Sequence, residues 1–121
     1  MLAKILVFTG LVVLAGCSSN HRIENLTSEQ RAKAATMMVY EAAPDKPFTI
    51  IKSVAGLSCN RNKFQAQAIS DHESLEGVKI EAALLGADAV INTFCQTNSD
   101  TDWGNNCWAS VKCVGDAVKF K

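Results

Sequence analysis

The chain has five cysteines, and their chemistry is the most informative feature of the sequence: Cys17, Cys59, Cys95, Cys107 and Cys113. A thiol can be acylated, oxidised to a disulfide, bound to a metal or used as a redox nucleophile. Zinc sites usually contain close pairs such as C-x2-C, and dithiol redox catalysts need a C-x-x-C motif, and the chain contains neither. In an oxidising compartment the last four cysteines would form two structural disulfides, with three possible connectivities. Metal binding is the weaker alternative, and redox catalysis is weaker still.

Cys17 follows a segment that is typical of an export signal. Residues 1–16 contain one early cation, Lys4, and then an apolar run. This run is shorter than the roughly 20 apolar residues that span a bilayer. The tetrapeptide Leu14-Ala15-Gly16-Cys17 resembles the lipobox of bacterial lipoproteins, in which the cysteine is acylated and the signal is cut before it. An ordinary cleaved signal or a buried strand is the alternative.

The lipobox resemblance predicts the ends and the location of the mature chain. We expect a signal peptide over residues 1–16 and an anchor in membrane lipid through acylated Cys17. More than one acyl chain is needed for stable anchoring. Ser18 follows the cysteine, where lipoproteins kept in the inner membrane often carry aspartate, so the outer membrane is expected. Acylation of Cys17 also leaves an even number of cysteines for disulfides.

Length and charge restrict the remaining possibilities. The 121 residues suffice for one small domain, and we expect a lipidated N-terminus and tether over residues 17–36 and a folded domain over residues 37–121. The formal net charge of +0 provides no basic face for nucleic acid. There is no HExxH motif, glycine-rich phosphate loop or Ser-His-Asp pattern, and His21 and His72 are expected to be solvated. We expect no enzyme, no cofactor and no metal site.

Two capping boxes mark the expected helices. Thr27-Ser28-Glu29-Gln30 predicts a short helix over residues 28–35 within the tether, and Ser70-Asp71-His72-Glu73 predicts the main helix. The main helix should end at Gly86. Its apolar face is predicted from helical spacing to comprise Leu75, Val78, Ala82 and Leu85.

The strands are expected on both sides of the main helix. They are predicted over residues 37–40, 48–54 (ending near Gly56), 90–96 and 107–114, with 117–120 continuing the sheet after a bend at Gly115. Residues 58–69 should be irregular. The expected fold class is α+β: a small, mostly antiparallel sheet of about four strands, with one main helix packed on it and two disulfides.

The strand order favours one disulfide connectivity. If the last two strands form a hairpin centred near Gly104, Cys95 lies roughly opposite Cys113. Cys107 then lies near the loop end of the hairpin, where it can reach Cys59. This argument favours Cys59–Cys107 with Cys95–Cys113 over the other two connectivities.

A set of short motifs around the cysteines resembles a known family. They are Lys46-Pro47-Phe48, Val54-Ala55-Gly56, Ser58-Cys59, Gly86-Ala87-Asp88-Ala89-Val90, Phe94-Cys95, Cys107-Trp108 and Val111-Lys112-Cys113-Val114-Gly115. Their order over residues 46–118, together with the lipobox, resembles the RcsF family of outer-membrane lipoproteins, which sense envelope damage for the Rcs phosphorelay. The chain departs from that family in its tether, which is short and has no proline before Pro44.

The resemblance implies a stress sensor that activates signal transduction through protein–protein contacts. It implies a small α+β domain with the same two non-consecutive disulfides, lipid-anchored to the outer membrane and lying in the periplasm. The implied partners are outer-membrane barrel proteins, the barrel assembly machine and an inner-membrane regulator of the phosphorelay. The alternatives are a structural envelope lipoprotein without signalling output, or a small metal-binding periplasmic module, since the Gly86–Val90 segment is also similar to a wider family with proposed metal-binding roles.

Two tryptophans remain as candidates for a binding surface, because tryptophan is enriched among residues that dominate interface energies. Trp103 lies in a polar turn and is the candidate for a partner contact. Trp108 is expected to cover the outer face of the sheet.

Overall fold

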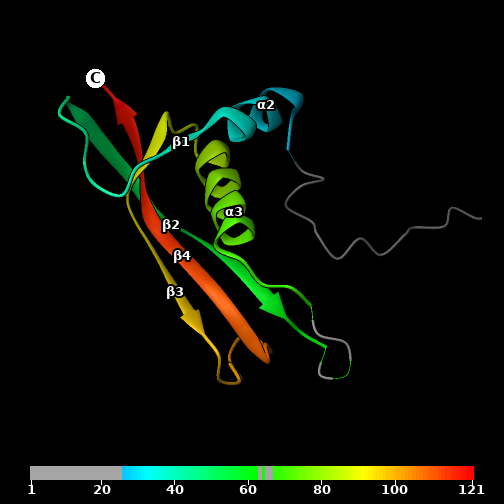
Figure 1. Ribbon diagram of the computed structural model, residues 1–121. Helices are drawn as coiled ribbons and strands as arrows, with labels where there is room; N and C mark the ends of the chain where they lie inside the picture. Colours follow the sequence, from blue (N-terminus) through cyan, green and yellow to red (C-terminus); the bar gives the residue numbers. More distant parts are fainter. Residues whose placement is uncertain (1–25, 63, 65–66) are drawn as a thin grey trace, which may run out of the picture.

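The computed structural model describes residues 26–62, 64 and 67–121. Its elements, in chain order, are α2 (Ser28–Thr36), β1 (Met38–Val39), β2 (Phe48–Asn60), α3 (Asp71–Leu84), β3 (Ala89–Asn98) and β4 (Ala109–Phe120). The strands form a sheet in the order β1-β3-β4-β2, in which β4 pairs antiparallel with β2 and β3, and β1 pairs parallel with β3. Helix α3 lies across one face of the sheet and α2 lies near one end of α3 (Figure 1). The predicted α+β fold is confirmed.

Local capping signals start both helices where the sequence predicts. Thr27 forms a complete capping box with Gln30, in which each side chain accepts a hydrogen bond from the other residue's backbone N–H. Ser70 caps α3 by accepting from the N–H of Glu73 at 3.1 Å. The N–H of Ser70 donates to the Ser58 side chain at 3.0 Å, which ties the start of α3 to β2.

The buried face of α3 consists mainly of small residues. Ser74, Val78, Ala82 and Ala83 are buried, whereas Leu85, predicted on this face, is the C-cap residue and is 36% exposed. The contact is close because β2 presents Gly56 to the helix. A Cβ atom on Gly56 would lie 1.9 Å from the carbonyl oxygen of Ser74, so only glycine fits there.

This close contact explains why the predicted end of the second strand is wrong. Gly56 does not terminate β2, which continues to Asn60. Every residue from Lys52 to Asn60 pairs with β4, and the pairing ends at Asn60↔Ala109. The glycine therefore accommodates the helix within a strand that continues past it. Ser58 and Cys59, predicted in an irregular segment, belong to this strand.

The expected bend at Gly115 is also not observed, since β4 is one strand from Ala109 to Phe120. The irregularity lies in β3 instead, where Asn92 and Thr93 together face Gly115 in a β-bulge. Asn92 has a φ of 54°, a left-handed conformation that asparagine tolerates. A Cβ on Gly115 would lie 2.5 Å from Val90 Cγ1 and 3.0 Å from Thr93 Cγ2, so the glycine makes room for Val90 and for the bulge residue Thr93.

Apolar side chains form two clusters on opposite faces of the sheet. The main core lies between the sheet and the two helices. Its buried members include Val54, Val78, Val90, Val111 and Ala117. The second cluster is smaller and comprises Ala89, Ile91 and Val118, with Tyr40, Phe48 and Phe120 packed against it. Within the described residues no helix is long and apolar enough to cross a membrane.

Asp88 joins α2, the turn after α3 and the end of β4. Its carboxylate accepts a hydrogen bond from the backbone N–H of Phe120 at 2.8 Å and lies 3.7 Å from Lys33 Nζ and 3.9 Å from Lys119 Nζ. Both ammonium groups also donate to the carbonyl oxygen of Gly86. The Phe120 hydrogen bond, followed by the two lysine charges, lowers the pKa of Asp88 from its ordinary value of 3.8. The 28–36 segment, assigned to the tether from sequence, thus contacts the domain through Lys33.

Candidate functional site

The four cysteines predicted to form disulfides are all paired, in the favoured connectivity. Cys59 is bonded to Cys107 with a Cα–Cα distance of 5.5 Å, and Cys95 to Cys113 with a Cα–Cα distance of 4.0 Å. Because all four sulfurs are bonded in pairs, none is a thiolate available to a metal. Within the part of the chain that the structure describes, no three His, Cys, Asp or Glu residues gather as a metal site would require.

Cys59–Cys107 holds together two segments at the end of the sheet away from α2 (Figure 1). Cys59 is the penultimate residue of β2, while Cys107 precedes β4 and forms an isolated bridge with Asp102. Cys107 was predicted within the fourth strand, but β4 begins at Ala109. The N–H of Trp108 donates to the carbonyl oxygen of Asn60 at 2.7 Å, so a hydrogen bond lies beside the disulfide.

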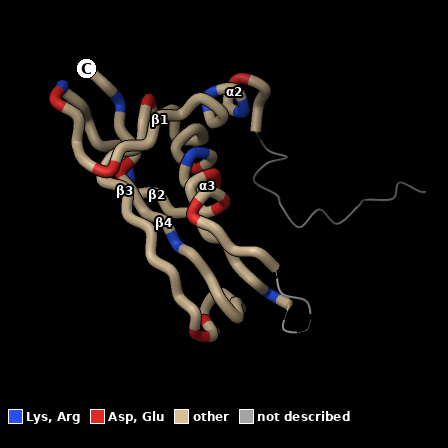
Figure 2. Tube along the Cα trace, viewed as in Figure 1, with Lys and Arg blue, Asp and Glu red and all other residues tan. Residues whose placement is uncertain are grey.

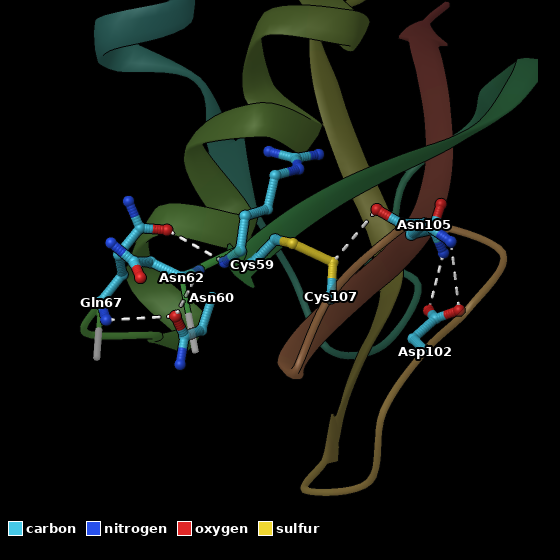
Figure 3. The surroundings of a disulfide bond; sticks show 8 residues. Cys59, Asn60, Asn62, Gln67, Asp102, Asn105 and Cys107 are labelled. Atoms are coloured by element: carbon cyan, nitrogen blue, oxygen red, sulfur yellow. Dashed lines mark hydrogen bonds between the residues drawn. A yellow bond between two sulfur atoms is a disulfide. The ribbon is translucent and has the colours of Figure 1, made fainter. Parts of the chain in front are cut away.

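Polar side chains order both segments near this disulfide (Figure 3). On one side, Asn60 Oδ1 accepts from the backbone N–H groups of Asn62 and Gln67. On the other side, the Asp102 carboxylate accepts from the backbone and the side chain of Asn105, at 3.2 and 2.8 Å. These hydrogen bonds, the side-chain one first, lower the pKa of Asp102. The 102–107 turn is therefore ordered by its own polar groups and by the disulfide.

The ordered turn presents Trp103, the candidate partner contact, to solvent. Its side chain is 82% exposed, whereas tryptophan is on average highly buried in folded proteins. Phe64, in the segment that follows β2, is 95% exposed. Trp108 is 38% exposed. The structure thus places Trp103 where a partner could reach it, and the contact itself stays a prediction.

Cys95–Cys113 lies beneath the first turns of α3, beside a buried serine. Ser74 Oγ donates to the carbonyl oxygen of Gly56 at 2.7 Å and accepts from the N–H of Cys113 at 2.8 Å. Gly56 and Cys113 are direct register partners on β2 and β4. A side chain from the helix therefore bridges two neighbouring strands of the sheet. Sequence reasoning missed Ser74, although a serine on the apolar face of a predicted helix is a signal that it meets a backbone group.

An open groove of about 780 Å³ follows the outer side of β3. It is lined by Met37, Met38 and Val39, by Asp71, Leu75 and Lys79 of α3, and by Thr93, Phe94 and Cys95 of β3. The groove has both apolar surface and charge, with Glu41 and Asp71 contributing carboxylates. No motif in the sequence pointed to it, because its residues come from three separate segments.

The predicted lipidation site, Cys17, lies outside the described residues, as do the signal over 1–16 and His21. His72 is exposed in the first turn of α3. The described residues assemble no set that matches the hydrolytic or phosphate-binding motifs sought in the sequence, and the features able to act in binding are the Trp103 turn and the groove beside β3.

Comparison with known proteins concerns the fold. No family model matches the chain. No curated protein matches it either. Among solved structures, the chain is similar to the crystal structure of a protein of unknown function from Pediococcus pentosaceus ATCC 25745 that belongs to the DUF74 family. The TM-score is 0.55 and the sequence identity is 18%, and the match covers 70% of this chain and 98% of that chain. At this identity the likeness extends to the α+β fold and no further.

Proposed function

We propose that this protein is an outer-membrane lipoprotein of the RcsF type, which reports envelope stress to the Rcs phosphorelay through protein–protein contacts. The observation that carries the proposal is the pair of non-consecutive disulfides, Cys59–Cys107 and Cys95–Cys113, in the connectivity that the RcsF resemblance implies. The lipobox-like segment ending at Cys17 supports an anchored chain in an oxidising compartment.

In this proposal the chain works by position and shape, without turnover. Acylated Cys17 holds the N-terminus at the membrane, and the chain then enters the domain at α2. The turn that presents Trp103 lies at the opposite end of the sheet from α2 (Figure 1). A partner approaching the domain from the end away from α2 would meet this turn first. The proposed partners are barrel proteins, the barrel assembly machine and the inner-membrane regulator.

Lipid labelling and fractionation test the anchor. The full chain expressed in a Gram-negative host should incorporate a clickable palmitate analogue and separate with the outer membrane. Cys17→Ser should abolish labelling, because serine lacks the thiol that is acylated. Ser18→Asp should keep the label and move the protein to the inner membrane, and Ser19→Ala is the matched control that should change neither. A labelled Cys17→Ser variant would contradict the assigned anchor.

A reporter assay tests the signalling role. In a host that lacks its own sensor of this type, the chain should restore induction of an Rcs-dependent reporter by an envelope-damaging agent, and Cys17→Ser should not. A chain that is lipidated, correctly located and disulfide-bonded, yet leaves the reporter silent, would refute signalling and identify a structural envelope lipoprotein instead.

A further inference from the structure

The outer edge of β3 is covered along only part of its length. Strand β1 pairs with Ala89 and Val90, and Tyr40 then accepts hydrogen bonds from the N–H and side chain of Thr93. Within the described residues, no strand pairs with this side of β3 from Phe94 to Asn98. β3 nevertheless remains paired with β4 over this stretch, as far as Asn98↔Ser110. We call residues 94–98 the open edge. They belong to a regular strand that is paired on one side, with β4, and, among the described residues, unpaired on the other.

The backbone of the open edge points outward at alternate residues. The Cα–Cα distance of 4.0 Å between Cys95 and Cys113 is typical of a pair that does not exchange hydrogen bonds. The N–H of Cys113 donates to Ser74, on the β2 side, which agrees with this assignment. In such a pair both residues direct their N–H and C=O away from each other, so those of Cys95 face the open edge. Those of Thr97, two residues on, face the same way.

Residues 94–98 themselves lack the features that protect sheet edges from pairing, and the bulge of β3 at Asn92 and Thr93 ends just before them. Proteins discourage added strands with charged side chains, prolines and bulges. The other edge of this sheet, β2, carries Lys52 and a register irregularity at that point. Residues 94–98 carry no charge and no proline, and β3 is uncharged throughout (Figure 2). Their register with β4 is regular.

The groove beside the open edge defines the chemistry of an occupant. Met38, which is 56% exposed, and the partly buried Leu75 offer apolar surface for alternate side chains of an added strand. The groove is also lined by the carboxylates of Glu41 and Asp71, whereas Lys79 Nζ is engaged by Glu76 at 3.3 Å. A basic side chain is therefore complementary to the groove. A second copy of the chain would bring the same carboxylates together, which is unfavourable.

We propose that residues 94–98 and this groove bind an extended segment of a partner protein, which adds to the sheet as a strand. The segment would have apolar residues at alternate positions and at least one lysine or arginine. Backbone hydrogen bonds to Cys95 and Thr97 would provide affinity, and the groove would select the side chains. This inference goes beyond the proposed signalling role and does not depend on it.

Selection from a displayed library of random seven-residue peptides, on the purified full chain with both disulfides oxidised, tests the proposal. Selected peptides should alternate apolar residues and contain lysine or arginine. In the complex, the backbone amides of Cys95 and Thr97 should exchange with solvent at least about tenfold more slowly than in the free protein, because they become hydrogen-bonded. Selected peptides without alternation, or binding that leaves both amides unprotected, would overturn the proposal.

A proline substitution separates backbone pairing from side-chain contact. Thr97→Pro removes an outward N–H and leaves β4 pairing possible, since proline is tolerated on edge strands with that N–H facing solvent. It should weaken peptide binding at least about tenfold. Thr97→Ala is the matched control, keeps the N–H and should bind within about twofold of the parent. Amide spectra of β4 must show that the Thr97→Pro variant is folded.

Two further outcomes decide the identity of the occupant. Glu41→Gln should weaken binding of lysine- or arginine-containing peptides several-fold at low salt and less at high salt. Sedimentation of the full chain should show a monomer. A dimer that Thr97→Pro dissociates would identify a second copy as the occupant and overturn the proposed partner segment. Equal binding by Thr97→Pro and Thr97→Ala would overturn strand addition altogether.

Discussion

Two regions of this small domain each contain a disulfide but differ in how the groups around it pack. Where α3 covers the sheet, the contact depends on a close fit of small groups, such as Gly56 against the backbone of Ser74. At the loop end, beyond α3, large aromatic side chains are exposed and the disulfide Cys59–Cys107 connects the segments. We therefore expect the first region to resist an added atom, and the second to tolerate changes of side chain while depending on its disulfide.

The largest effect should follow loss of the loop-end disulfide. Replacing Cys59 and Cys107 together by alanine should lower the free energy of unfolding by about 4 kcal/mol, because the bond closes a loop with a sequence separation of 48. Denaturant unfolding measures this change. The matched variant removes Cys95–Cys113, with a separation of 18, and should cost about 3 kcal/mol from loop closure. Each variant also leaves a cavity at one buried cysteine, Cys107 or Cys113, so the difference between the two variants comes from loop length.

Hydrogen exchange then distinguishes the two regions. In the Cys59/Cys107 variant, amides of the 102–107 turn should lose protection well before those of β4. If the two disulfide variants lose protection in the same places, the loop end is not the separately stabilised region described above.

The next largest effect tests the close fit under α3. Gly56→Ala should destabilise the domain by about 3 kcal/mol, since its Cβ cannot approach the Ser74 carbonyl without displacing the helix. Gly104→Ala, in the loop-end turn, is the matched control and should cost less than about 1 kcal/mol, because a Cβ there meets nothing closer than Asp102 Oδ1 at 3.4 Å. Thermal melting of both variants measures the difference. Equal losses would show that the two regions are equally tolerant.

A smaller effect concerns Asp88, at the α2 end of the helix-covered region. Asp88→Ala should cost about 1 kcal/mol through loss of the hydrogen bond from Phe120. Because the pKa of Asp88 is lowered on folding, its contribution is present above the ordinary value of 3.8 and is lost as the pH falls through the lower folded-state pKa. The difference in unfolding free energy between parent and variant should therefore shrink in acid. A difference that stays constant with pH would contradict the assigned role of the carboxylate.

The smallest effect on stability should come from the exposed tryptophan. Trp103→Ala should change the free energy of unfolding by less than about 0.5 kcal/mol, because the side chain is 82% exposed. In the reporter assay the same variant should lower the induced signal if this turn contacts a partner. A fully active variant would show that Trp103 is not part of the partner contact. It would not affect the expected difference between the two disulfide variants.

Local features of the sequence predicted most of the fold. Each helix start follows from a capping residue and a backbone N–H three positions later. The pairs are Thr27 with Gln30 for α2 and Ser70 with Glu73 for α3. The disulfide pairing followed from the register of a single hairpin, in which Cys95 is paired with Cys113. These interactions join residues that are close in sequence or on consecutive strands.

The errors arise where the partner is distant in sequence. Gly56 is a plausible strand end when considered alone, and its role becomes clear only with α3 against it. Ser74 is missed because its two partners, Gly56 and Cys113, are 18 and 39 residues away. The parallel placement of β1 beside β3, which creates the groove, likewise depends on the assembled sheet.

The hydroxyl of Ser74 has a consequence for how the domain folds. Because it completes the hydrogen bonding of Gly56 on β2 and of Cys113 on β4, the centre of the sheet is satisfied only when the helix is docked. Sheet formation and helix docking are thus one event energetically, and we expect no stable intermediate that contains the complete sheet without α3. The helix-covered part of the domain should unfold in a single cooperative transition, in which circular dichroism at helical wavelengths and loss of amide protection in β4 report the same midpoint.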